Sequence, residues 1–110
     1  MDTKKLLNEM SKEELVNILD DMITDRDIKI LMARRKYCLN ILINDEDWAV
    51  RAEVAKQGYG LDKLIKDKDY RVRNRVAMQG YGLDKLVNDK DYRVRETVKF
   101  MLTNNINKLA

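Results

Sequence analysis

The strongest constraint on the fold of this chain is an internal repeat with a period of 22 residues. QGYGLDKL at 57–64 recurs at 79–86, and DKDYRVR at 67–73 recurs at 89–95. DEDWAVR at 45–51 keeps the second pattern one period earlier. Such a period is typical of small supersecondary units that stack, because one unit cannot bury its apolar face alone. The sequence therefore predicts a stack of similar units.

A degenerate copy precedes these units at the same offset. Its apolar positions match those of the next unit while its polar positions differ, and the matching residues are Ile28, Met32, Ala33, Tyr37, Leu39, Leu42 and Ile43. Drift of this kind is expected in an end unit, which faces something other than a copy of itself. We therefore expect one domain with an N-terminal helical cap at 1–22 and units at 23–44, 45–66, 67–88 and 89–110, the last serving as a C-terminal cap.

Each unit is expected to hold a helix, a tight turn and a shorter helix. In the unit at 45–66, Asp47 is the expected N-cap of a helix over about 48–57, and Val50 and Val54 share one face of it. Gly58 suits the end of that helix, because glycine adopts the left-handed conformation without a steric cost. A short helix then begins near Leu61. No run alternates with period two, so we expect an all-α protein.

The two ends of the chain depart from this pattern. Ser11 and Glu14 form a capping-box signature, which opens a helix with an apolar face of Leu15, Ile18, Leu19 and Met22. The last unit replaces the glycine-rich turn with FMLTNNINKLA. Its apolar residues either seal the end of the core or form a homodimer surface: Phe100, Met101, Leu102, Ile106 and Leu109.

The shared pattern DxDxxVRxxVAxQGYGLDKL, in the units at 45–66 and 67–88, resembles the short helical repeats of the leucine-rich repeat variant family. Its Asp-x-x-x-Arg spacing is similar to that of HEAT-like repeats, and the resemblance covers roughly 23–110. It implies a right-handed α-α superhelix, or solenoid, of about four repeats that binds a partner. The best-known type of member of the variant family carries an iron-sulphur cluster on an N-terminal cysteine cluster. This chain has only Cys38, so the resemblance implies no cofactor here.

The composition excludes most familiar active sites. The chain has no histidine, and its only serine and cysteine are Ser11 and Cys38. A Ser-His-acid triad, a Cys-His pair and a histidine-ligated zinc site all need residues that are missing. Catalysis would have to rest on carboxylates, Lys or Tyr, for example with Asp84 or Glu96 as the base. No sequence motif supports such a role. We expect no enzyme, no catalytic or metal-binding residues and no cofactor.

Cysteine content and hydropathy bear on location. A single cysteine allows no intramolecular disulfide, which favours a reducing cytoplasm. The first fifteen residues, MDTKKLLNEMSKEEL, lack the apolar run of a signal peptide, and no segment approaches the roughly 20 apolar residues of a membrane span. We therefore expect a cytoplasmic protein that does not enter a membrane.

Acidic, basic and aromatic residues recur with the period of the units. The acid pairs Asp45/Asp47, Asp67/Asp69 and Asp89/Asp91 have the chemistry of cation or acid-base sites. Because every unit keeps them, we expect them instead to cap helices and to pair with the arginines four residues after the second acid: Arg51, Arg73 and Arg95. Two aromatic columns are expected to pack between units: Trp48, Tyr70 and Tyr92, and Tyr37, Tyr59 and Tyr81.

Binding residues are expected where the units differ. The exposed helix stripe should comprise positions 49, 52, 53 and 56 and their equivalents. Across the last two units this stripe combines basic and apolar side chains, and the candidates are Arg71, Asn74, Arg75, Met78, Arg93 and Phe100. A protein-binding adaptor or inhibitor, monomeric or dimeric through an end unit, is the leading hypothesis. The alternative is sequence-nonspecific nucleic-acid binding through the three arginines. A merely solvated face also fits.

Overall fold

The computed structural model describes residues 9–21 and 26–109, and within these ranges it is all-helical with no strand. This confirms the expectation of an all-α protein. Four helices of nine or more residues form the main series after α2, and three single-turn helices connect them. The helices are α2 (Lys12–Asp21), α3 (Arg26–Arg34), α4 (Leu39–Leu42), α5 (Trp48–Lys56), α6 (Leu61–Leu64), α7 (Tyr70–Met78), α8 (Leu83–Leu86) and α9 (Tyr92–Leu109).

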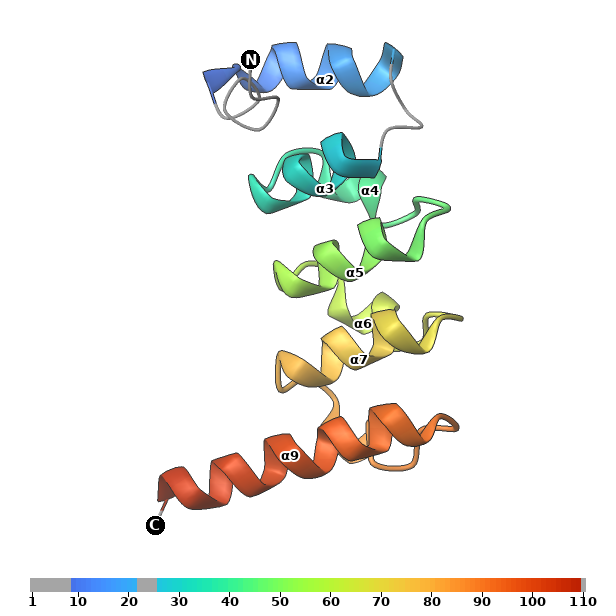
Figure 1. Cartoon of the computed structure of the whole chain (residues 1–110), viewed down its shortest axis with the longest axis vertical. Coiled ribbons are helices and arrows are strands. Elements are labelled where there is room, and N and C mark those ends of the chain that lie inside the picture. Colours follow the sequence, from blue (N-terminus) through green and yellow to red (C-terminus); the bar gives the residue numbers. More distant parts are fainter. Residues whose placement is uncertain (1–8, 22–25, 110) are drawn as a thin grey trace.

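The longer helices lie one behind another along the molecule (Figure 1). Helix α5 packs between α3 and α7, and α7 packs between α5 and α9, while α2 lies on α3. The short helices α4, α6 and α8 each return the chain to the start of the next long helix. The molecule measures 46 × 30 × 21 Å. Each long helix therefore packs mainly against the long helices of the preceding and the following unit.

Local sequence signals set the helix ends. The side chain of Asp47 accepts a hydrogen bond from the backbone N–H of Ala49, and Asp69 does the same for Arg71, both at 2.9 Å. An aspartate at this position satisfies one of the N–H groups that the first turn leaves open. Helix α5 ends before Gly58, whose φ is +78°. The predicted caps and the predicted glycine stop are confirmed.

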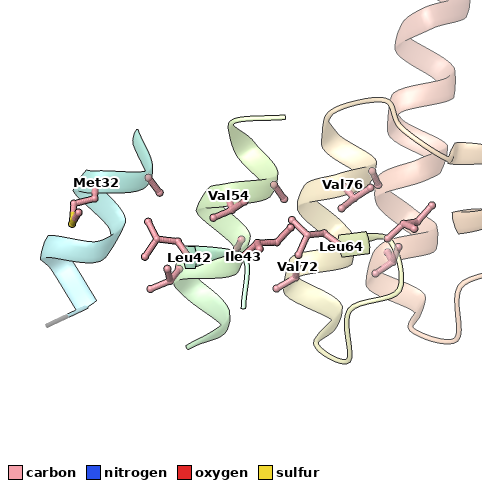
Figure 2. Close-up of a cluster of buried hydrophobic side chains, with 14 of the residues drawn as sticks. Met32, Leu42, Ile43, Val54, Leu64, Val72 and Val76 are labelled. Atoms are coloured by element: carbon pink, nitrogen blue, oxygen red, sulfur yellow. The ribbon is translucent and has the colours of Figure 1, made fainter. Parts of the chain in front are cut away.

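The core is a continuous apolar seam through the helices (Figure 2). Long helices contribute pairs of valines one turn apart and short helices contribute one leucine each, all at most 3% exposed: Val50, Val54, Val72, Val76, Val94, Val98, Leu42, Leu64 and Leu86. Full burial of one such side chain stabilises the fold by about 1.5–3 kcal/mol. The seam explains why these positions keep the period of 22.

The first unit makes the same turn with unfavourable residues. Lys36 has a φ of +61° and Cys38 of +59°, at the positions that Gly58 and Gly60 take one unit later. A residue with a Cβ atom is strained in this region by about 1–2 kcal/mol. The degenerate unit therefore keeps the path of the chain at a local cost.

The C-terminal end differs from the inner units because α9 continues through the positions of the glycine turn. Phe100 and Leu102 are exposed, so of the two alternatives the sealing of the core is wrong for them, and the homodimer surface stays a prediction; Met101 is partly buried. At the other end, Ser11 accepts from the N–H of Glu14 at 3.2 Å and Leu15 is buried, as expected. Ile18, Leu19, Met22, Ile106 and Leu109 lie outside the residues whose side chains the structure describes.

Candidate functional site

A ladder of ion pairs joins successive helices along one side. Arg51 Nε and Nη2 donate to the two carboxylate oxygens of Asp67, at 2.8 and 3.2 Å. Arg73 binds Asp89 in the same way, at 2.8 and 3.1 Å. All four side chains are less than a tenth exposed. The predicted pairing of each arginine with an acid four residues earlier is therefore wrong. The second acid of each pair caps its own helix, and the arginine reaches the first acid of the next unit.

The same acids and arginines also bind backbone. Arg73 Nη1 donates to the carbonyl of Asp67 at 2.7 Å, and the carboxylate of Asp67 accepts the N–H of Asp69 at 2.9 Å. Burial opposes ionisation of Asp89, but hydrogen bonds from Arg73 and from the backbone N–H of Asp91 outweigh it and lower the pKa. Over the described residues no group of three or more potential ligands is placed to hold a metal ion. These acids serve the structure.

Arginines and aromatic rings alternate along the column that begins with Trp48 and Tyr70. The guanidinium of Arg71 lies 3.8 Å from the ring centroid of Trp48, and that of Arg93 lies 3.6 Å from Tyr70. Each is also held by the acid two residues before it, Arg93 by Asp91 at 2.9 and 3.0 Å. The hydrogen bond from Arg93 lowers the pKa of Asp91 to about 2. Both candidate arginines therefore carry matched charges and a packing role.

The other aromatic column does not follow the prediction throughout. Tyr59 and Tyr81 are exposed, whereas Tyr37 is partly buried and lies beneath the guanidinium of Arg35, 4.9 Å from the ring centroid. In the column of Trp48, Tyr70 and Tyr92, the first two rings lie against an arginine of the next unit. The prediction of packing between units is wrong for Tyr92, whose side chain is 63% exposed.

The expected exposed stripe is partly covered in the unit at 45–66. Ala52 and Glu53 are buried, which corrects the prediction for these positions. Arg34 of α3 reaches across to Glu53, with 2.7 Å between Nε and Oε1, and covers it. The short side chain of Ala52 ends at Cβ, so larger neighbours shield it. In this unit Lys56 is the exposed position of the stripe, and in the last two units Arg71, Arg75, Met78, Arg93, Glu96 and Phe100 are exposed.

A shallow groove of about 440 Å³ lies between α7 and α9. It brings together three of the predicted residues, Asn74, Met78 and Phe100, with three more from α9: Glu96, Thr97 and Met101. Met78 is 45% exposed and Phe100 is 62% exposed. Sequence reasoning missed Met101 as a binding residue. Its spacing of four from Thr97 was the available signal, since residues four apart share a helix face.

Two polar groups mark the edge of this groove. The Oδ1 atom of Asn74 is buried and accepts no hydrogen bond within the described part of the chain. An unsatisfied buried acceptor costs about 1–3 kcal/mol. Arg75 is exposed beside the groove, and its Nη1 lies 3.8 Å from the sulphur of Met78. The groove therefore offers apolar surface with one cation next to it, while Asn74 Oδ1 is enclosed by the protein's own atoms.

Comparison with known protein families, characterised proteins and solved structures finds no match. The groove between α7 and α9 is therefore interpreted from its own lining residues.

Other features offer less for binding or chemistry. An open hollow of about 720 Å³ beside α4 includes Lys29 and Asp45, which pair with each other at 2.7 Å. Of the carboxylates considered for catalysis, Asp84 is exposed on α8, and Glu96 is exposed with Lys99 at 3.4 Å. Among the described helices, none is both long and apolar enough to cross a membrane.

Proposed function

We propose that this chain is a non-catalytic protein-binding module, an adaptor or inhibitor, that holds its partner in the groove between α7 and α9. The scaffold in this proposal is a right-handed α-α superhelix of about four repeats, related in design to leucine-rich repeat variant and HEAT-like repeats. The period of 22 residues and the side-by-side packing of successive long helices support it. The lone Cys38 supports a reducing, cytoplasmic setting for the interaction.

The observation that carries the proposal is the groove between α7 and α9 with its exposed apolar side chains, Met78 and Phe100. Methionine and aromatic side chains are enriched at the centres of protein interfaces, and Met78 and Phe100 are both exposed here. A partner that covers them would remove apolar surface from water. Arg75 and Glu96 supply a polar rim.

Nucleic-acid binding has weaker support. Of the three arginines in the basic patch, Arg71 and Arg93 are neutralised by Asp69 and Asp91 and lie on aromatic rings. Only Arg75 lacks an acidic partner among the described residues. Affinity for nucleic acid rises with the number of phosphates neutralised, so one free arginine provides little.

The test compares three forms of the chain as bait in extract from its source cells, with quantitative identification of retained proteins. The forms are wild type, the groove variant Met78→Ser/Phe100→Ser, and a control, Ile41→Ser. Ile41 is 53% exposed, a value between those of Met78 and Phe100, but it lies on α4. We expect a protein that wild type and control retain and the groove variant loses. Its purified form should bind the groove variant at least about tenfold more weakly, a difference of about 1.4 kcal/mol.

Two results would count against the proposal. One is a retained protein whose affinity is unchanged by the groove substitutions. The other is retardation of labelled DNA or RNA at near-physiological salt that disappears in Arg75→Ala, which would favour the nucleic-acid alternative instead.

A further inference from the structure

Two interfaces inside the molecule share one docking pattern. On α5, Arg51 receives the carboxylate of Asp67 and the ring of Trp48 receives the guanidinium of Arg71. On α7, Arg73 receives Asp89 and Tyr70 receives Arg93. The incoming segment thus offers an aspartate and, four residues later, an arginine at the start of a helix. Helices α5 and α7 each receive this pair with one arginine and one aromatic ring.

Helix α9 carries the same two receiving groups without the incoming pair. Arg95 Nη1 donates to the carbonyl of Asp89 at 2.6 Å, as the preceding arginines do to theirs. Within the described residues, however, no carboxylate reaches its Nε and Nη2. Tyr92 is 63% exposed, and the guanidinium nearest to its ring, at 5.6 Å, is that of its own neighbour Arg93. Figure 1 shows α9 as the last helix of the series.

We infer that this end of α9 docks a helical segment of a partner protein that carries Asp or Glu followed, four residues later, by Arg. The carboxylate binds Nε and Nη2 of Arg95 in the bidentate geometry of the Arg73–Asp89 pair, and the arginine lies on the ring of Tyr92. A bidentate pair fixes direction as well as attraction, because both oxygens must align with the planar guanidinium. The stacked arginine adds a cation–π contact. The spacing of the two groups therefore sets the specificity.

A second copy of this chain offers no suitable segment. Its first unit has Ile23 and Asp27 where the docking segments have Asp67 and Arg71. Docked in the same way, Asp27 would bring a carboxylate to the face of Tyr92, and ring faces repel anions. The pairs Asp67/Arg71 and Asp89/Arg93 of another copy are already engaged in their own molecule. A second copy docked in this way is accordingly not the occupant.

This surface is separate from the groove of the proposed function, since neither Met78 nor Phe100 belongs to it. The two proposals can therefore fail independently.

The experiment follows Tyr92 and the Arg95 side chain by NMR in the full-length, isotope-labelled chain during titration with a synthetic 22-residue peptide of sequence 67–88. A control peptide carries Asp67→Asn and Arg71→Ala. We expect the Tyr92 ring and Arg95 Nε–H signals to shift with the first peptide, and the control peptide to bind at least about tenfold more weakly. Arg95→Gln and, separately, the surface change Tyr92→Ser should each weaken binding of the first peptide by a similar factor, with unchanged circular dichroism.

Three outcomes would overturn the inference. The first is no shift at Tyr92 or Arg95 at millimolar peptide, or equal shifts with both peptides. The second is that the shifts centre on Met78 and Phe100, which would put the peptide in the groove. The third is that the signals of Tyr92 and Arg95 change with the concentration of the chain alone, which would make a second copy the occupant.

Discussion

Arg73 of α7 and Asp89, sixteen residues further on, form a bidentate ion pair that links one unit to the next. Both side chains are 6% exposed. The arginine also donates to the carbonyl of Asp67, and the aspartate also accepts the N–H of Asp91. A single pair thus joins two helix starts, which explains why both residues recur every 22 positions.

Removing one partner of this pair should destabilise the fold strongly. Arg73→Ala leaves the buried carboxylate of Asp89 without its guanidinium, and such losses cost about 3–5 kcal/mol. The matched control is Arg71→Ala, which removes an ion pair with 43% exposure on the arginine side and should cost much less, because solvent screens an exposed pair. Urea unfolding followed by circular dichroism measures both. Equal costs for the two variants would contradict the buried role of Arg73.

Stability should fall in acid, over a window set by the aspartates. Asp69, Asp89 and Asp91 have pKa values below their ordinary value of 3.8, that of Asp91 at about 2. Between about pH 4 and pH 2 the unfolded chain therefore binds more protons than the folded chain, so the free energy of unfolding decreases as the pH falls through this window. Urea unfolding from pH 6 to 2 checks this. Asp91→Asn keeps a competent helix cap and should flatten the decrease; an unchanged slope would argue against the Asp91 contribution.

The left-handed turn of the first unit offers a stabilising substitution. Lys36→Gly relieves the strain of a φ of +61° and should raise the free energy of unfolding by roughly 0.5–1 kcal/mol, after the greater freedom of glycine in the unfolded chain is counted. The reciprocal change Gly58→Lys should lower it by a similar amount. Thermal unfolding of both variants is sufficient, and changes of the same sign would refute the explanation.

The groove residues should be dispensable for folding. Met78→Ser/Phe100→Ser removes exposed side chains and should change the free energy of unfolding by less than about 0.5 kcal/mol per site. Val98 lies on α9, like Phe100, but in the core, so loss of packing in Val98→Ala should cost more than about 1 kcal/mol. Chemical unfolding separates the two cases. A large loss of stability in the groove variant would show that these side chains serve the fold.

The parts of the fold that follow local rules were predictable. The cap at Asp47, the stop at Gly58 and the face of Val50 and Val54 depend on residues within one unit. The partner of Arg51 was not predictable in this way, because it depends on how one unit is set against the next. The burial of Glu53 beneath Arg34 has the same cause.

The candidate site was predicted in part for a related reason. Met78 and Phe100 were found because the units differ there, and the structure brings them together with Asn74. Arg71 and Arg93 were predicted as binding residues because the units also differ at their positions. In the structure, however, each guanidinium is paired with an aspartate and lies on an aromatic ring. Sequence comparison between units finds variable positions. It does not tell whether a charge there is already matched.

The most direct test of the central claim is photo-crosslinking in the source cells with a benzoylphenylalanine residue at position 100, compared with the same residue at position 41. The account predicts a defined protein adduct from position 100 that is absent from position 41, and its loss when Met78→Ser is added. Adducts that are equal at both positions, or an adduct to nucleic acid alone, would contradict a protein-binding groove between α7 and α9.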